Sequence, residues 1–255
     1  MISVALDPRG GALVARVTLD NPAKLNCLGR DALAQFAADM RALDHDPRIR
    51  AVVVTGAGKA FCGGADLDAL GGLNPLTARV FIGQIHEACA AVRDCPVPVI
   101  ARINGWCLGA GLELAASCDL RIAADTASFG MPEVRLGIPS VVETALLPRL
   151  IGAGRARWLV MTGETIDADL ALNWGLIEKA VAKKDLEKSI NHTLDAILAS
   201  DAEAMRAQKR LCKAWEETTL AESVRVSIDE FARSYDADEP NRRVAALRAA
   251  RRRKD

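Results

Sequence analysis

Two glutamates and two glycine-rich turns are the residues of this chain best suited to chemistry. Apart from weakly acidic thiols, Glu113 is the only ionisable side chain between Gly105 and Cys118, and it follows the turn at residues 109–111. Burying an unpaired carboxylate is costly or raises its pKa, so such a residue either meets a partner across the fold or serves proton transfer. Glu133 supplies a second acid behind Met131-Pro132.

Each acid also has a plainer interpretation. Glu113 could form a buried ion pair, with Arg121 or Arg102 as the partner, and Glu133 could be a surface acid beside Arg135. The residues alone leave the choice open for Glu113 and favour the surface position for Glu133.

The two glycine-rich turns lie at residues 61–66 and 109–111. Each follows a predicted strand, so its backbone N–H groups could hold an anion or a developing oxyanion. Either turn could equally be structural. Neither has the GxGxxG or GK[ST] pattern, so the sequence does not predict a dinucleotide-binding or P-loop protein.

These turns need elements that position them. Alternating apolar residues predict a strand at 13–19, helical spacing predicts a helix at 31–43, and the run at 51–55 predicts a buried strand. A helix at 76–93 and a strand at 97–103 repeat the order strand, glycine-rich turn, helix. Short strands are expected at 120–123 and 127–129, and residues 140–252 are expected to be nearly all helical.

Composition narrows the class of protein. The 255 residues are half apolar with net charge zero, which suits one sizeable core and gives no general case for nucleic-acid binding. Seven scattered cysteines without CxxC spacing indicate reduced thiols in a cytoplasmic protein, and the three histidines have no metal-ligand spacing. No secretion signal or membrane span is expected. The basic tail is expected to be a solvated helix end, or else to meet ligand phosphates; it contains Arg242, Arg243, Arg248, Arg251, Arg252, Arg253 and Lys254.

Several long segments, in order, resemble the crotonase superfamily, also called the enoyl-CoA hydratase/isomerase family. They are AFCGGADLDAL (60–70), PVIARINGWCLGAGLELAASCDLRIAAD (98–125), ASFGMPEVRLGIPS (127–140), LVMTGE (159–164) and ALNWGLIEKAV (171–181). The resemblance implies an α/β spiral of repeated β-β-α units over residues 1–190, followed by a C-terminal helical trimerisation region over 191–255. It also implies an acyl-CoA substrate, no metal or separate cofactor, and a homotrimer or dimer of trimers.

The resemblance assigns roles to particular residues. The backbone N–H groups of Ala65 and Ala110 would form the oxyanion hole, Glu113 would orient and activate water, and Glu133 would transfer the proton at C2. Substrate contacts are expected from a set around the turns: Ala23, Lys24, Cys62, Gly64, Asp66, Leu67 and Gly109.

The reaction expected from this resemblance is addition of water to a 2-enoyl-CoA thioester, giving 3-hydroxyacyl-CoA. A 3,2-enoyl-CoA isomerase working through Glu133, or a non-catalytic CoA-binding subunit, are the alternatives. The segment at residues 138–144 departs from the glycine-rich sequence of familiar hydratases, which puts the acyl group in question. Within it, Glu143 is expected to be a first-turn helix acid, the alternative being a third carboxylate facing the acyl group.

Overall fold

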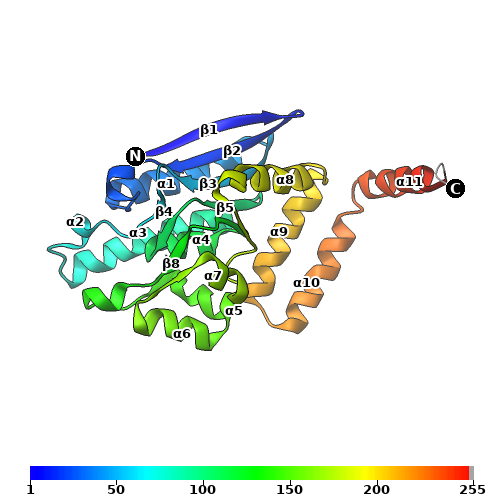
Figure 1. The fold of residues 1–255 in the computed structure, drawn as a ribbon. Helices are drawn as coiled ribbons and strands as arrows, with labels where there is room; N and C mark the ends of the chain where they lie inside the picture. The colour runs from blue at the N-terminus through cyan, green and yellow to red at the C-terminus, as the bar shows by residue number, and fades with distance from the viewer. Residues whose placement is uncertain (253–255) are drawn as a thin grey trace. The chain divides into compact units, whose positions relative to one another are not determined.

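The strands of the chain form two sheets (Figure 1). The computed structural model describes residues 1–252. The large sheet has the order β1-β2-β3-β5-β7-β10, and the small sheet has the order β4-β6-β8-β9. The strands are β1 (Ile2–Arg9), β2 (Ala12–Leu19), β3 (Ile49–Gly56), β4 (Ala60–Cys62), β5 (Val99–Ile103), β6 (Trp106–Leu108), β7 (Leu120–Ala124), β8 (Ser128–Gly130), β9 (Thr165–Asp167) and β10 (Lys179–Val181).

The sheet order reveals a repeated β-β-α unit. The pairs β3–β4, β5–β6 and β7–β8 each send their first strand into the large sheet and their second into the small sheet, and helical segments follow. The helices of this part are α1 (Arg30–Ala42), α2 (Leu67–Leu70), α3 (Pro75–Asp94), α4 (Ala110–Ser117), α5 (Leu147–Ile151), α6 (Ala153–Thr162), α7 (Ala168–Trp174) and α8 (Leu186–Leu198). Short 3-10 helices are η1 (Pro22–Lys24), η2 (Leu43–His45), η3 (Glu133–Leu136), η4 (Val142–Leu146) and η5 (Lys183–Asp185). The expected α/β spiral of β-β-α units is confirmed.

Local sequence explains the longer elements. Residues 51–54 of β3 are fully buried, as expected of a parallel strand covered on both faces. Helix α3 begins with a capping box between Asn74 and Thr77, with Pro75 in its first turn, and it ends where Cys95 precedes Pro96. Its buried face packs over the core with α1.

The prediction that residues 140–252 are nearly all helical is wrong at two places. β9 pairs with β8 in the small sheet, and β10 pairs with β7 in the large sheet. Each has three residues, too few for an alternating pattern to stand out between helices. The antiparallel partner of β2, strand β1, was also not predicted.

Helix α8 belongs with the sheets. Leu186, Ile190 and Leu194 of α8 are fully buried, and the helix packs against β3 and β7. The chain divides into Met1–Ala199 and Ser200–Asp255, whereas the predicted boundary between residues 190 and 191 falls inside α8.

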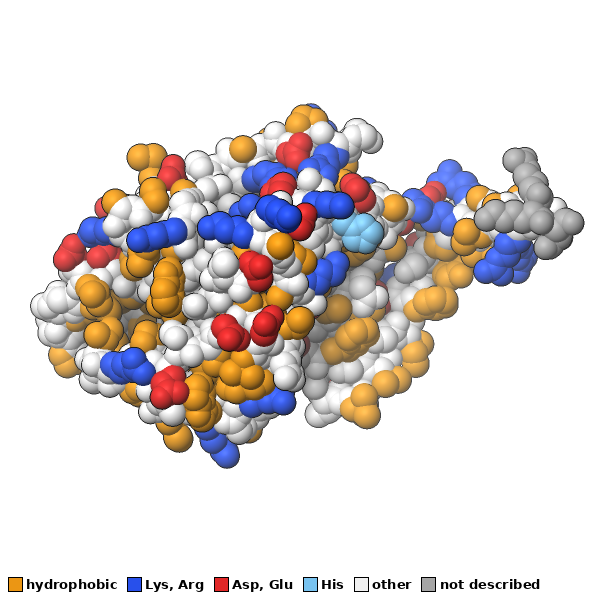
Figure 2. Space-filling view, viewed as in Figure 1, with side chains coloured by type: hydrophobic (Ala, Val, Ile, Leu, Met, Phe, Trp, Pro, Cys, Tyr) orange, Lys and Arg blue, Asp and Glu red, His pale blue; other side chains and the backbone are white. Residues whose placement is uncertain are grey.

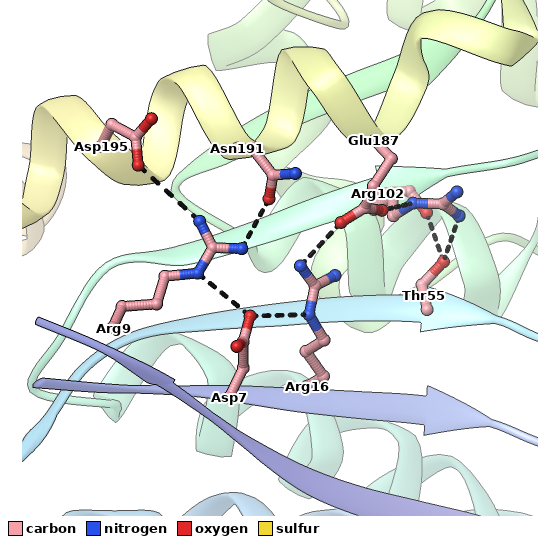
Figure 3. Close-up of polar contacts among 8 residues, drawn as sticks. All are labelled: Asp7, Arg9, Arg16, Thr55, Arg102, Glu187, Asn191 and Asp195. Atoms are coloured by element: carbon pink, nitrogen blue, oxygen red, sulfur yellow. Dashed lines mark hydrogen bonds and ion pairs between the residues drawn. The ribbon is translucent and has the colours of Figure 1, made fainter.

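A polar network also joins α8 to the large sheet (Figure 3). Glu187 accepts hydrogen bonds from Arg16 of β2 (2.7 Å) and Arg102 of β5 (3.0 Å). Arg9 of β1 donates to Asn191 (2.7 Å), which lies one turn along the same face of α8. The helix is therefore held by both apolar packing and charge-assisted hydrogen bonds.

The Ser200–Asp255 unit is helical, with α9 (Ala202–Glu217), α10 (Leu220–Arg233) and α11 (Glu239–Arg252). In the basic tail, Arg242 and Arg243 pair with Glu239, within the first turn of α11. Arg253 and Lys254 lie outside the described residues.

The described residues also show the state of the thiols and the distribution of charge. All seven cysteines are free, and residues 1–252 contain no group of His, Cys, Asp or Glu that could hold a metal ion. In that same range, no helix combines the length and apolarity needed to cross a bilayer. Basic and acidic side chains are interspersed on the face of the first unit drawn in Figure 2.

Candidate active site

Three loops converge at one edge of the small sheet. Because β4, β6 and β8 are parallel neighbours, their carboxyl ends lie at the same edge. The loops beyond them carry Gly64–Ala65, Gly109–Ala110 and Glu133. The N–H of Gly109 donates to the carbonyl of Gly130 (2.9 Å), which ties the second loop to the third. Residues far apart in the chain are thereby assembled into one site.

The second turn requires glycine at residues 109 and 111, for two different reasons. Gly109 has φ +50° and ψ −124°, a conformation that side-chain-bearing residues rarely adopt. A Cβ on Gly111 would lie 2.5 Å from the carbonyl oxygen of Cys62 in β4. The turn therefore brings the start of α4 directly against the end of β4.

Ala65 and Ala110 carry backbone N–H groups on two turns that approach each other closely. A Cβ placed on Gly64 would lie 3.7 Å from the nitrogen of Ala110, so the two turns are in near contact. Ala110 is the first residue of α4, where N–H groups have no intrahelical acceptor. Among the hydrogen bonds of residues 1–252, neither alanine N–H donates to a protein acceptor. This arrangement fits the predicted pair of donors for an oxyanion.

Glu113 lies one turn into α4, a helix whose residues are all buried. Its Oε1 accepts hydrogen bonds from both the N–H (3.1 Å) and the hydroxyl (2.7 Å) of Thr144. The ion pair considered for Glu113 does not form, because Arg121 pairs with Glu178 and Arg102 pairs with Glu187. Glu113 is held by neutral donors instead.

Burial changes the protonation of Glu113. Loss of hydration raises its pKa from the ordinary 4.5 to about 7, although the two hydrogen bonds from Thr144 oppose the rise. The negative charges of Glu133 and Glu143 add to it. A carboxyl group with this pKa exchanges protons near neutral pH, as a general acid or base requires.

Glu133 begins η3, directly after the third loop. Its Oε2 accepts a hydrogen bond from the hydroxyl of Ser140 (2.7 Å). Its Oε1 would lie 2.5 Å from a Cβ on Gly109, so this carboxylate reaches back over the second turn. The interpretation of Glu133 as a surface acid beside Arg135 does not fit these contacts.

One short segment supplies hydrogen-bond donors to both glutamates. Ser140 binds Glu133, and Thr144 binds Glu113. Sequence reasoning identified this segment only as a departure from familiar hydratases and missed both donors. Glu143 lies in the first turn of η4, as expected, but it is buried and bonded to His86 rather than solvated.

A cavity of about 490 Å³ opens onto these groups. Its walls are largely apolar, and the apolar lining residues that were not predicted include Leu25, Phe81, Ile82, Ile85, Ile138 and Val141. The predicted residues that line it are Gly64, Ala65, Leu67, Gly109, Ala110, Glu113 and Glu133. An apolar pocket with a few convergent polar groups is the usual form of a small-molecule site.

Four predicted substrate contacts do not line this cavity: Ala23, Lys24, Cys62 and Asp66. Cys62 is fully buried, and its sulfur accepts from the N–H of Gly64 (3.4 Å). Lys24 binds Asp66 (3.0 Å) and Asp68 (2.6 Å), and these hydrogen bonds raise the pKa of its ammonium group. Asp66 also caps α2 through the N–H of Asp68.

A larger hollow, about 850 Å³, lies within the Ser200–Asp255 unit. Its charged groups pair with one another: Arg210 and Arg233 both bind Glu230. The convergence of acids and of N–H donors without protein acceptors favours the smaller cavity as the reactive site.

Comparison with known proteins agrees with this geometry. The model of the enoyl-CoA hydratase/isomerase family matches residues 9–248. The chain is 33% identical to a crotonyl-CoA hydratase of Syntrophomonas wolfei over 92% of its length and 91% of that protein. It is 32% identical to a short-chain-enoyl-CoA hydratase of Clostridium acetobutylicum, covering 92% of this chain and 90% of that one. A crystal structure of an enoyl-CoA hydratase from Bacillus anthracis superposes with a TM-score of 0.91 at 31% identity, covering 97% and 96% of the two chains.

Proposed function

Because the chain belongs to the enoyl-CoA hydratase/isomerase family, we propose that it is an enoyl-CoA hydratase-like lyase, which adds water to a 2-enoyl-CoA thioester and forms 3-hydroxyacyl-CoA. One observation carries the proposal. Two carboxyl groups, each held by its own hydroxyl donor, face one apolar cavity beside two N–H groups without protein acceptors. Hydration of a conjugated thioester needs these four groups.

The reaction balances with the residues present. Glu113 accepts a proton from water as the water oxygen bonds to C3, and the C2–C3 π electrons move onto the thioester to give an enolate. The N–H groups of Ala65 and Ala110 stabilise the enolate oxygen, and Glu133 donates a proton to C2. A proton passed from Glu113 to Glu133 then restores the starting state.

The raised pKa of Glu113 supports its role as the base. A carboxylate with pKa about 7 holds a proton from water more readily than an ordinary glutamate does. Ser140 orients the carboxyl group of Glu133 toward the second turn, where C2 of a thioester held by Ala110 would lie. No metal or separate cofactor is required, since CoA is part of the substrate.

We expect CoA to approach over the loop after β4. Lys24 is half exposed and could meet a CoA phosphate if it released Asp68, which is exposed. Leu67 lines the mouth beside Ala65. These contacts, with Ala23, Cys62 and Asp66, remain predictions from family resemblance.

The assembly and location are also proposed. Helix α10 exposes Val224, Ile228 and Phe231 at helical spacing, which suits an interface between copies in a homotrimer or dimer of trimers. A cytoplasmic location is supported by the free cysteines. Analytical ultracentrifugation of the protein tests the assembly, and a monomer at micromolar concentration would contradict it.

The absorbance of the conjugated thioester tests the reaction. A short 2-enoyl-CoA should lose this absorbance as water adds, and Glu113→Gln and Glu133→Gln should each slow the loss by about 10²-fold or more. Circular dichroism of each variant checks that it is folded. If the absorbance instead grows from a 3-enoyl-CoA and a 2-enoyl-CoA is not consumed, the enzyme is an isomerase and the proposal is wrong.

A further inference from the structure

Glu143 is a buried carboxylate that the proposed reaction does not use. Its side chain is 9% exposed, and the Nδ1–H of His86 in α3 donates to its Oε1 over 2.7 Å. Its other oxygen, Oε2, is buried and has no hydrogen-bond partner within residues 1–252. A buried carboxylate with one unbonded oxygen lowers the stability of the fold, which points to a role other than stability.

The position of Glu143 in the chain links it to Glu113. The next residue, Thr144, donates both of the hydrogen bonds that Glu113 receives. Element η4 packs against both α3 and α4, so it bridges the helices of His86 and Glu113. The hydrogen bond from His86 therefore holds in place the segment in which Thr144 lies.

The backbone before Glu143 is strained. Val142 has φ +41°, which is an outlier for a β-branched residue. Such conformations persist only where surrounding contacts hold them. The bonds of Glu143 to His86 and of Thr144 to Glu113 involve the two residues that directly follow Val142, so they are suited to hold its conformation.

The charge of Glu143 also acts on Glu113. Its negative charge is among the causes that raise the pKa of Glu113. Glu133 of η3 and Cys89 of α3 also interact electrostatically with Glu113, and His86 of α3 binds Glu143. The thiols of Cys118, Cys107 and Cys62 interact in turn with Cys89 and with one another. Burial raises the pKa of the Cys62, Cys89 and Cys107 thiols, which keeps them neutral. Glu143 and Glu133 are thus the two acidic side chains whose charges act on Glu113.

We propose that Glu143, held by His86, is a positioning residue for Glu113: it sets the place of Thr144, and it adds a negative charge to the surroundings of Glu113. The inference rests on the proposed function for its catalytic meaning. The effect of Glu143 on Glu113 itself is tested in the free enzyme, where no turnover is needed.

Two neighbouring substitutions separate this proposal from a purely structural role. Glu143→Gln keeps an acceptor for His86 and removes the charge, so the pKa of Glu113 should fall. Thr144→Val removes the hydroxyl that stabilises the ionised form, so the pKa of Glu113 should rise. A general loss of order in η4 would shift the pKa of Glu113 in the same direction in both variants.

The measurement is the titration of Glu113 by 13C NMR in the free enzyme, with glutamate carboxyl carbons labelled. Glu113→Gln identifies the signal by its loss. Shifts of opposite sign in the two variants support the proposal. The proposal is overturned if Glu143→Gln leaves the pKa of Glu113 unchanged or raises it, as Thr144→Val is expected to do. This holds even if hydration is confirmed.

Substitutions of His86 test the positioning. His86→Ala removes the donor, and kcat should fall about tenfold with KM little changed, because Thr144 no longer holds Glu113 in place. His86→Asn retains a donor near the position of Nδ1 and should recover most of that loss. Equal kcat in His86→Ala and the parent enzyme would contradict the positioning role.

Discussion

Replacing Gly109 with alanine tests how closely the second turn and Glu133 are fitted. A Cβ at this position would lie 2.5 Å from Oε1 of Glu133, whereas real Cβ atoms essentially never come closer than 3.0 Å to another atom. The carboxylate must therefore retreat by at least 3.0 − 2.5 = 0.5 Å, and by 0.9 Å to reach the 3.4 Å of ordinary contact. The carboxylate is the mobile end of a side chain, so it should move before the backbone does.

A displacement of this size has a calculable consequence. Misplacing a reacting group by about 1 Å can reduce the rate by about 10²-fold, which corresponds to about 2.7 kcal/mol of transition-state stabilisation. The backbone strain of alanine at positive φ should also lower the free energy of unfolding by about 1–3 kcal/mol. Gly109→Ala should therefore lose both stability and activity.

Gly10→Ala is the matched control for strain. Gly10 has φ +56°, close to the +50° of Gly109, and no atom lies within 4 Å of its added Cβ. Gly10→Ala should lower the free energy of unfolding without lowering kcat per folded molecule. Hydration rates would be measured with a 2-enoyl-CoA and normalised by the folded fraction from urea unfolding.

Two results would refute the reasoning. Gly109→Ala could retain kcat within about threefold of Gly10→Ala, which would mean that Glu133 need not occupy this place. Alternatively, Gly109→Ala and Glu133→Gln could lower kcat by independent factors that multiply in the double variant. If the methyl acts by displacing Glu133, the second substitution should add little.

Three further outcomes are expected. The pKa of Glu113 is about 7 in the native state and 4.5 ordinarily, so its ionisation lowers the free energy of unfolding as pH rises between these values. In urea unfolding, Glu113→Gln should therefore leave the free energy of unfolding unchanged at pH 4 and raise it by about 3 kcal/mol at pH 8. Glu187→Gln should lower the unfolding free energy by about 1–2 kcal/mol without changing kcat, because it weakens bonds from Arg16 and Arg102 far from the cavity. Ile82→Phe should lower kcat/KM for long acyl chains more than for short ones, because Ile82 lines the cavity.

Apart from the short strand β8, the elements predicted from sequence are those long enough to show a period or an apolar run. The helix at α3 and the strands β2, β3, β5 and β7 had clear spacing or apolar runs, and all are present. Strands β4 and β6 have three residues each, so their sequences read as parts of the glycine-rich loops. Their pairing comes from the spiral arrangement of the chain, which local periodicity does not encode.

The acids and turns of the site were predictable, whereas the groups that hold the acids were not. Glycine and buried glutamate stand out by residue type. Ser140 and Thr144 do not, because hydroxyl residues in a loop more often bond to their own backbone. Their role depends on the loop returning across α4 and η3, and the sequence shows only that this segment is unusual.

The surroundings of Glu113 argue against a structural ion pair. A buried carboxylate kept for structure should have a cation beside it, yet both candidate arginines are taken by Glu178 and Glu187. The charges that act on Glu113 are negative, and its hydrogen bonds from Thr144 only partly offset the loss of hydration. An environment that destabilises the charged form at neutral pH lowers native stability and yields a group that exchanges protons there. That combination is expected where function opposes stability, and it explains why neutralising Glu113 should stabilise the fold at pH 8 while slowing the proposed reaction by about 10²-fold or more.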